Sequence, residues 1–581
     1  MKKYTNEKNI QMLLYLLKEN GIKKVIVNPG TMNMSFVTSI QQDDFFELYS
    51  CVDERSACYM ACGMAAESNE PVVLTCTGAT ASRNYMPGLT EAFYKKLPII
   101  TITCTPHLGN IGNNIPQMID RRNELNDTYK YSTYIPPIKQ PDDLWYDNLE
   151  INKAFLQLKS NNPGPVHINL GTEVTKIFDV EELPKFRVIR KYKLYDDFPD
   201  LNDYKKIAIF IGNHAIINNE LQSEIETFCS NYNAVVICDY TSNYYGKYKI
   251  QFNILCDQES IDMPNNFDLL IHIGNTSGAY MKLDPVSVWR VNPDGLVVDT
   301  FKKLKNVFEM AEFDFFRKCN NENYQKKDNT LFDELNNEII SFSNLANELD
   351  LPFSNLYISK NLINKLPDDS VVHLAILNTL RSWNYFNSNK RFNVYCNTGG
   401  FGIDGILSTL IGASLCNTNK NYFGVVGDLA FFYDLNSLGN RHINSNLRIL
   451  LVNNGCGTEF HNYSHPAHVI GQDSVSPYIA ADGHFGNKSE NLVKNFVENL
   501  GFEYLSAKTK SEFTDNLDYF CSDKIYAKPV VFEVFTNSSD ESEALSMIRN
   551  LKSTFKGKLK KQIKNNLSEE SKSKIKKIIK R

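Results

Sequence analysis

The strongest chemical pattern lies between residues 427 and 457, where polar residues follow two apolar segments. YFGVV is followed by Gly427 and Asp428, and RILLV is followed by Asn453, Asn454 and a Gly-Cys-Gly turn. If both segments are neighbouring parallel strands, their carboxyl ends meet at the edge where ligands bind. A carboxylate, an amide oxygen and a turn carbonyl suit Mg²⁺ and leave positions for phosphate oxygens and water. The pattern predicts a metal–diphosphate site, although similar patterns also arise by chance in α/β domains.

Two other segments carry candidate chemistry. Glu54, in VDERSACYMACGMA, follows an apolar segment and begins a helix of small residues. The helix dipole alone favours an acid there, but a carboxylic acid at a strand–helix junction can also move protons. The loop NTGGFGIDG contains Gly402, which permits close backbone approach, and Ile403, a bulky apolar side chain suited to lie beneath a ligand. A glycine-rich loop of this kind is weak evidence on its own.

Parallel sheets are needed to position these residues, and the chain contains three blocks in which β-branched segments alternate with helical patterns. The first block contains KKVIVNPG and PVVLTCTG, the second contains KKIAIFIGNHA, and the third contains NYFGVVGDL and LRILLVNNG. We expect a polar connector over about residues 173–203 and a helix from about Tyr433. The predicted fold class is α/β with three Rossmann-like parallel-sheet domains, over residues 1–178, 200–345 and 355–545, followed by a basic tail over residues 550–581.

Composition excludes several classes of protein. The 581 residues are 42% hydrophobic and 22% charged, which is typical of a globular protein. A net charge of −5 indicates no general attraction to nucleic acid, and no nucleic-acid partner is expected. The N-terminus is expected to form an amphipathic helix rather than a signal peptide, and no apolar run is long enough to span a bilayer. The 13 cysteines lack metal-type spacing, so a reducing, cytoplasmic location is predicted.

The C-terminal tail differs in charge from the rest of the chain. From Leu551 to Arg581 there are 12 Lys or Arg residues against two Glu. Basic helical segments there would make a weak contact with a membrane surface or a polyanion. A solvated extension is the simpler interpretation, because the apolar stripe is thin.

The order Gly-Asp…Asn-Asn resembles the signature of the thiamine diphosphate enzyme superfamily. The resemblance implies that Mg²⁺ is bound by the Asp428 carboxylate, the Asn454 side chain and the Cys456 main-chain carbonyl, so Cys456 is not proposed as a nucleophile. It also implies that Glu54 hydrogen-bonds the distal ring nitrogen of the cofactor's aminopyrimidine and supports its imino tautomer. Further cofactor contacts are expected from Gly402, Ile403, Gly427, Leu429 and Ala430.

The similarity is closer to one branch of this superfamily. NTGGFGIDGILSTLIG, VVGDLAFFYDLNSL and VDERSACYMACGMA together resemble the menaquinone-pathway carboligase, 2-succinyl-5-enolpyruvyl-6-hydroxy-3-cyclohexene-1-carboxylate synthase. Leu429 followed by YDLNSL is typical of that branch. The resemblance implies pyrimidine-binding, central and diphosphate-binding domains, in that order. It also implies a homodimer or homotetramer, in which the cofactor lies between the first domain of one subunit and the third domain of its partner.

The substrate-binding residues of that family are not retained. The synthase binds 2-oxoglutarate and isochorismate with several arginines, but the aligned positions here hold Met32, Thr105, Thr398 and, in an uncertain register, Trp383. Neither Met nor Thr can form the bidentate pair of hydrogen bonds that Arg donates to a carboxylate. Gln117 does match a glutamine of the family's site.

Two polar residues stand where the family tends to be apolar. Glu459 and His461 could serve as acid–base groups for a different acceptor, or they could be surface residues of a loop. We therefore predict a thiamine diphosphate enzyme that decarboxylates a 2-oxo acid and transfers the acyl-anion equivalent to an unknown acceptor, with Glu54, Gln117 and His461 as catalytic residues. The alternatives are the synthase itself, a simple 2-oxo acid decarboxylase, or a non-catalytic protein that kept the fold.

Overall fold

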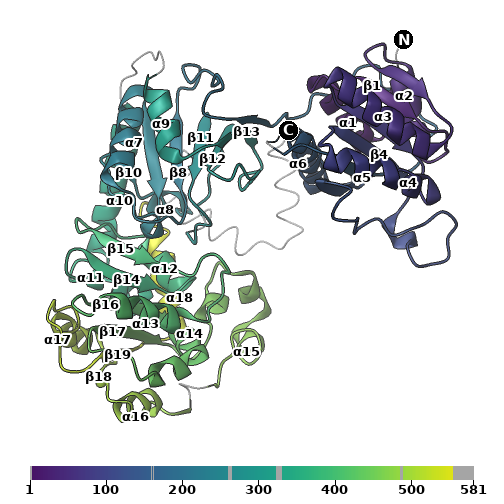
Figure 1. Cartoon of the computed structure of the whole chain (residues 1–581). Coiled ribbons are helices and arrows are strands. Elements are labelled where there is room, and N and C mark those ends of the chain that lie inside the picture. The colour runs from purple at the N-terminus through teal and green to yellow at the C-terminus, as the bar shows by residue number, and fades with distance from the viewer. Residues whose placement is uncertain are drawn as a thin grey trace. The chain divides into compact units, whose positions relative to one another are not determined.

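The computed structural model describes residues 3–158, 160, 162–259, 265–279, 281–321, 330–484 and 488–553 (Figure 1). The chain divides into two compact units, Met1–Asp196 with Asp294–Glu309, and Asp197–Pro293 with Met310–Arg581. The strands belong to three sheets whose neighbouring strands run parallel. The predicted α/β class is therefore confirmed. The basic tail from residue 554 onward lies outside the described residues.

The first unit contains a parallel sheet in the order β2-β1-β3-β4-β6-β5. Helices α1, α2 and α6 pack on one face of this sheet, and α3 and α5 pack on the other. The central strands β3, β4 and β6 are buried along their whole length, as the apolar runs predict. The elements are α1 (Lys8–Glu19), β1 (Lys24–Val27), α2 (Met34–Gln41), β2 (Glu47–Ser50), α3 (Glu54–Ser68), β3 (Val72–Cys76), α4 (Thr80–Asn84), α5 (Met86–Tyr94), β4 (Ile99–Thr105), β5 (Tyr131–Ile135), α6 (Pro141–Leu158) and β6 (Val166–Gly171).

The central sheet has five strands in the second unit, in the order β10-β9-β8-β11-β12. The polar connector expected over residues 173–203 contains a short strand, β7 (Arg190–Tyr192), which pairs in parallel with β13 (Leu304–Glu309). The strand was not predicted, because only three residues pair, too few to produce an apolar pattern. The other elements are β8 (Ile207–Ile211), α7 (Asn219–Tyr232), β9 (Ala234–Cys238), β10 (Lys249–Ile250), α8 (Asn253–Cys256), β11 (Leu269–Ile273), β12 (Ser287–Asn292), α9 (Glu312–Asn321) and α10 (Thr330–Glu348).

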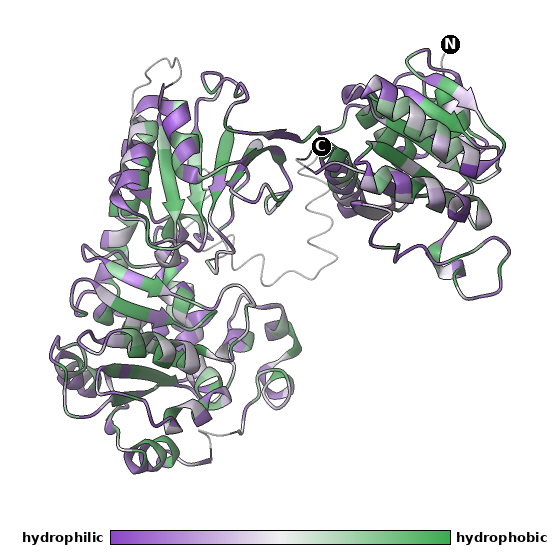
Figure 2. Ribbon diagram, viewed as in Figure 1, coloured by the Kyte–Doolittle hydropathy of each residue, from purple (hydrophilic) through white to green (hydrophobic). Residues whose placement is uncertain are grey.

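The third sheet has the order β15-β14-β16-β17-β19-β18 and also lies in the second unit. Apolar residues are concentrated on its strands, while the outer faces of the surrounding helices are polar (Figure 2). Its elements are α11 (Asn355–Leu362), β14 (Ser370–Leu374), α12 (Asn378–Trp383), β15 (Phe392–Tyr395), α13 (Ile406–Cys416), β16 (Tyr422–Gly427), α14 (Asp428–Tyr433), β17 (Leu447–Asn453), the 3₁₀ helices η4 (Thr458–His461) and η5 (Pro466–Ile470), α15 (Gln472–Val475), α16 (Leu492–Asn499), β18 (Glu503–Ala507), α17 (Lys510–Phe520), β19 (Val530–Phe535) and α18 (Ser538–Ile548).

The helix expected from about Tyr433 is only a short 3₁₀ helix, η3 (Leu435–Gly439), and an α-helix, α14, precedes it. Helix α14 begins at Asp428 and ends at Tyr433, because Phe431 and Phe432 turn into the core directly after β16. The Asp434 carboxylate then accepts hydrogen bonds from the backbone N–H and the hydroxyl of Ser408, both at 2.6 Å, in the first turn of α13. In the part of the chain described here, no helix is both long and apolar enough to cross a membrane.

Candidate active site

The predicted metal site is a turn at the carboxyl ends of two paired strands. Strands β16 and β17 pair in a register that sets Gly427 beside Val452, so Asp428 and Asn453 leave the sheet at the same edge. One Asp428 oxygen accepts the Gly455 N–H at 2.6 Å, and the other accepts the Leu429 N–H at 2.8 Å. Gly455 has φ +81°, a conformation that favours glycine. The turn is thus built around the Asp428 carboxylate.

Burial is the main electrostatic influence on Asp428. The side chain is 4% exposed, and burial raises the pKa of Asp428 to about 6, opposed by the surrounding backbone N–H donors. Among the residues that the structure describes, no Lys or Arg forms an ion pair with this carboxylate. A buried carboxylate without a cationic side chain is a suitable environment for a divalent cation.

The adjacent asparagines have different environments. Asn453 donates to Glu533 Oε1 at 2.6 Å and faces the interior. Asn454 donates weakly to Thr458 Oγ1, at 3.4 Å, while its own Oδ1 is buried and has no partner within the described chain. Such an unpaired buried oxygen is rare in proteins, and an amide oxygen in this position is a suitable ligand for a divalent cation. The residues present therefore fit the Mg²⁺ site that the sequence predicts.

Cys456 lies in the same turn with its thiol enclosed. Its Sγ lies 3.3 Å from Ser538 Oγ and 3.7 Å from His461 Nδ1, and burial raises the pKa of Cys456 to about 11. The thiol therefore remains protonated, and it is a poor nucleophile. The Cys456 carbonyl accepts the Thr458 N–H at 3.0 Å and retains a lone pair for a ligand.

The other residues predicted to contact the cofactor belong to the same sheet domain as this turn. Ile403 is half-buried against the core of the third sheet, and Ala430 is buried in it. Leu429 is half-buried at the start of α14. Gly402 is half-buried, and a Cβ there would lie 2.3 Å from Oδ1 of the exposed Asp404 side chain, which would have to turn away. Together with Asp428, these residues all belong to the second unit.

Glu54 is the first residue of α3 in the first unit. The preceding Asp53 caps the helix, accepting the Arg55 N–H at 3.0 Å and the Ser56 hydroxyl at 2.8 Å. The Glu54 carboxylate is half-buried and accepts a hydrogen bond from Asn84, at the end of α4, at 3.3 Å. Its predicted location at a strand–helix junction is confirmed, as β2 ends at Ser50.

The other substrate-site candidates of the first unit follow β4. Thr105 is the last residue of that strand, and its hydroxyl accepts a hydrogen bond from the buried Arg121 guanidinium. Arg121 also donates to Asn169 Oδ1 at 3.1 Å. Gln117 is exposed on the loop after β4, with φ +64°. Met32 packs against the core instead of facing solvent. Sequence inspection missed Arg121, although it lies only four residues after Gln117.

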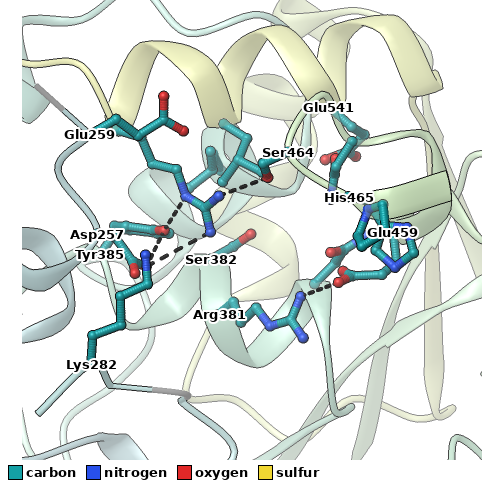
Figure 3. A pocket seen from close by; sticks show the side chains of 16 residues that line it. Asp257, Glu259, Lys282, Arg381, Ser382, Tyr385, Glu459, Ser464, His465 and Glu541 are labelled. Carbon is teal, nitrogen blue, oxygen red and sulfur yellow. Dashed lines mark hydrogen bonds and ion pairs between the residues drawn. The ribbon is translucent and has the colours of Figure 1, made fainter. Parts of the chain in front are cut away.

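Figure 3 shows a cavity of about 360 Å³. It adjoins the turn formed by Asp428 and residues 453–457, which is called the metal turn below. The two are connected by Thr458, whose hydroxyl accepts hydrogen bonds from Asn454 and, at 3.0 Å, from Asn378 of α12. In Figure 3, Arg381 points toward Glu459, and their atoms Nη1 and Oε1 are 2.5 Å apart. The lining residues come from the central sheet region, α11, α12 and the residues after it, η4 and the segment after it, and α18. They are Asp257, Glu259, Lys282, Leu356, Asn378, Arg381, Ser382, Tyr385, Glu459, Asn462, Ser464, His465, Pro466, Glu541, Leu545 and Arg549.

Two candidates do not line this cavity. Trp383 is fully buried, packing edge-on against Tyr240 and Phe392, so it does not replace an arginine at the cavity wall. Arg381, two residues earlier on α12, faces the cavity instead. The buried ring of His461 lies between two hydroxyl groups, with Nδ1 3.1 Å from Ser538 Oγ and Nε2 3.2 Å from Ser476 Oγ. Burial lowers the pKa of His461.

Comparisons with known proteins agree with these features. Residues 8–124 match the family model described as thiamine pyrophosphate enzyme, N-terminal TPP binding domain. The 2-succinyl-5-enolpyruvyl-6-hydroxy-3-cyclohexene-1-carboxylate synthase of Bacteroides fragilis is 30% identical over 572 residues, covering 93% of this chain and 98% of its own. The synthase of Bacteroides thetaiotaomicron is 30% identical over 565 residues, with the same coverage.

A solved structure was also found. The thiamine diphosphate-dependent 4-hydroxybenzoylformate decarboxylase of Rhodococcus jostii RHA1 covers 91% of this chain and 99% of its own, with 14% identity and a TM-score of 0.38, which is too low to support further conclusions. The sequence relatives are decisive, because they extend across nearly the whole chain. The chain belongs to the thiamine diphosphate-dependent enzymes, in the family of the 2-succinyl-5-enolpyruvyl-6-hydroxy-3-cyclohexene-1-carboxylate synthases.

Proposed function

We propose that the protein binds thiamine diphosphate with Mg²⁺, decarboxylates a 2-oxo acid and transfers the remaining acyl unit to an acceptor. The observation that carries this proposal is the metal turn, where a buried Asp428 carboxylate and an unpaired Asn454 Oδ1 lie at the same edge of the sheet. When bound, the cofactor supplies a carbon nucleophile for attack on a 2-oxo carbonyl. Both decarboxylation and carboligation begin with that attack.

The residues of the chain have distinct roles in this proposal. Asp428, Asn454 and the Cys456 carbonyl would hold the metal, which in turn holds the diphosphate. Glu54 would hold and return a proton at the aminopyrimidine ring, with its carboxylate oriented by Asn84. Gly402, Ile403, Gly427, Leu429 and Ala430 would enclose the cofactor and exclude water.

Substrate contacts are proposed for residues of both units. Gln117 is exposed on its loop and is available to a ligand. Glu459 lines the cavity in an ion pair with Arg381, so His461 is kept as the proposed acid–base group, and both of its ring nitrogens contact serine hydroxyls. If His461 acts on a substrate, its ring must first give up one of its hydrogen bonds with Ser538 and Ser476.

We also propose that the protein works as a homodimer or a homotetramer. The site requires Glu54 from the first unit and Asp428 from the second. Around α3, three large apolar side chains are exposed, with Val52 at 79%, Tyr59 at 48% and Met60 at 42%. A cluster of this kind is typical of a surface that another subunit covers.

The second candidate is the synthase reaction named for the relatives. Identity of 30% over 93% of the chain favours it. Met32, Thr105 and Thr398 argue against it, because none of these side chains can pair with a carboxylate as Arg does. A simple 2-oxo acid decarboxylase, with a proton as the final acceptor, is the third candidate.

One screen separates the three candidates. The protein is supplied with thiamine diphosphate and Mg²⁺ and given a panel of 2-oxo acids, with and without aldehyde acceptors, and carbon dioxide release is measured. Release that yields a ligated product supports the main proposal, while release with only an aldehyde product supports the simple decarboxylase. Turnover of isochorismate with 2-oxoglutarate would identify the synthase. No release from any 2-oxo acid, with or without isochorismate, would contradict all three.

A further inference from the structure

We propose that the cavity beside the metal turn binds the distal end of a 2-oxo monoacid whose side chain is uncharged and polar, and that it rejects a second carboxylate. The proposal rests on the proposed function, because the cavity is a substrate site only if the metal turn binds the cofactor. A volume of about 360 Å³ is within the range of small-molecule sites. Thr458 connects the cavity wall directly to Asn454.

The arginine of the cavity nearest the metal turn is already paired. Arg381 Nη1 lies 2.5 Å from Glu459 Oε1, and Glu459 directly follows Thr458 in the chain. The side chains of both partners are largely shielded, 25% and 19% exposed. Glu459 neutralises the charge of Arg381 through Nη1, so a substrate carboxylate that approached this guanidinium would also meet the negative charge of Glu459.

The second arginine of the cavity, Arg549, is also held by other side chains of the protein. Arg549 donates to Ser464 Oγ at 2.9 Å and to the Tyr385 hydroxyl at 3.3 Å, and it lies 3.9 Å from Asp257 Oδ2 (Figure 3). The Tyr385 hydroxyl itself donates to Asp257 at 2.7 Å. This guanidinium is therefore fixed by the protein's own groups.

One lining cation remains available. Lys282 has no ion-pair partner in the described part of the chain. The same cavity is also lined by four acids, Asp257, Glu259, Glu459 and Glu541. Glu541 is buried and accepts a hydrogen bond from Asn355. A ligand with two carboxylates would have to bring its second charge close to these four acids.

Neutral polar groups make up much of the remaining wall. Asn378, Ser382, Asn462 and Ser464 line the cavity and offer amide and hydroxyl groups. These groups can hydrogen-bond a hydroxyl, amide or ester without breaking an ion pair. The chemical class that fits is thus a singly charged 2-oxo acid with an uncharged polar end.

The test compares 2-oxoglutarate with its 5-methyl ester, which has the same chain but lacks the distal charge. For the wild-type holoenzyme we expect kcat/KM to be at least tenfold higher for the ester. Glu459→Gln removes the negative charge paired with Arg381, so the ratio of diacid to ester should rise at least tenfold. The double variant Arg381→Gln/Glu459→Gln should lose this gain, because no guanidinium remains to hold the distal carboxylate.

The matched control is Glu490→Gln, which removes the acid of a more exposed ion pair, Lys508–Glu490, also at 2.5 Å. It should leave the diacid-to-ester ratio unchanged. A wild-type preference for the diacid, or a ratio that Glu459→Gln does not alter, would overturn the proposal.

Failure of the proposed function would give a different result. If no 2-oxo acid is decarboxylated, the cavity is tested by calorimetric titration of the full-length chain with glutarate and with monomethyl glutarate. Tighter binding of the monoester, reversed in Glu459→Gln, would support the assigned selectivity without catalysis. Equal binding of the two, or no binding of either, would contradict it.

Discussion

At the scale of single residues, the two neighbouring asparagines of the metal turn, Asn453 and Asn454, are expected to have different roles, one in stability and one in metal binding. Removing the Asn454 side chain deletes an oxygen that has no partner in the described structure, so the apo protein should lose little stability. Removing Asn453 breaks a 2.6 Å hydrogen bond to the buried Glu533 and should cost about 1–3 kcal/mol. Asn454→Ala should abolish the rise in melting temperature produced by thiamine diphosphate with Mg²⁺, whereas Asn453→Ala should melt earlier but keep that rise.

These outcomes are measured by thermal unfolding of both variants with and without the cofactor and metal. If Asn454→Ala retained the full ligand-induced shift, this side chain would not be a metal ligand.

Glu54 allows a second prediction on single residues. Glu54→Gln retains size and the ability to accept a hydrogen bond from Asn84, but it cannot exchange a proton with the ring. We expect cofactor affinity within about threefold of wild type and turnover reduced by about 10²–10⁴. Glu67→Gln, an exposed glutamate near the end of the same helix, is the control and should remain active. Full activity in Glu54→Gln would assign the proton transfer to another group.

Some site residues were predictable from sequence and others were not, for a physical reason. Asp428 and Asn454 follow buried strands directly, so the strand pattern alone fixes which sheet edge they reach. Arg381 and Trp383 lie on the short helix α12, which begins after Leu377, a residue held at φ +66°. That turn decides which face of the helix meets the cavity, and a shift of two residues exchanges a buried indole for a guanidinium that lines the cavity. No periodicity in the sequence encodes the turn.

At the scale of elements, α6 contains a buried acid that should make stability depend on pH. Asp147 is fully buried, and neither carboxylate oxygen has a partner among the described residues. Burial raises the pKa of Asp147 to about 8, and the charges of Asp143 and Glu150 on the same helix add to the effect, while Tyr134 of β5 also interacts with it. The folded protein therefore favours the protonated form.

The sign of the effect follows from the raised pKa. Stability from Asp147 is fully present below its unfolded pKa of about 3.9 and is lost as pH rises toward 8, at a limiting slope of about 1.4 kcal/mol per pH unit. Asp147→Asn removes this dependence, so the melting temperature of the variant relative to wild type should increase by a few degrees between pH 5 and pH 8. A difference that is constant across this range would show that Asp147 does not titrate there.

The elements also show where sequence prediction reaches its limit. Buried parallel strands such as β4 and β17 are rich in β-branched and other apolar residues, and they were located correctly. β7 has only three residues and no apolar run, so its pairing with β13 could not be predicted locally. The start of α14 at Asp428 depends on Phe431 and Phe432 packing into the third sheet, which is a tertiary effect.

At the scale of the whole molecule, the proposed chemistry needs residues from both units, because Glu54 belongs to one and Asp428 to the other. If each site takes Glu54 from one subunit and Asp428 from its partner, two inactive variants can complement each other. In a heterodimer of Glu54→Gln and Asp428→Ala, one site would carry both substitutions and the other would carry neither. Heterodimers purified through two different tags should therefore show about half of the wild-type activity.

The control is a dimer of two differently tagged Glu54→Gln chains, which has no intact site and should be nearly inactive. If each site were built within one chain, every site of the heterodimer would contain one substitution, and its activity would be as low as that of the parents. The measurement of turnover per heterodimer thus decides between a shared site and a self-contained one. The exposed apolar residues Val52 and Tyr59 near Glu54 favour the shared arrangement, because exposed apolar side chains are often covered by another subunit.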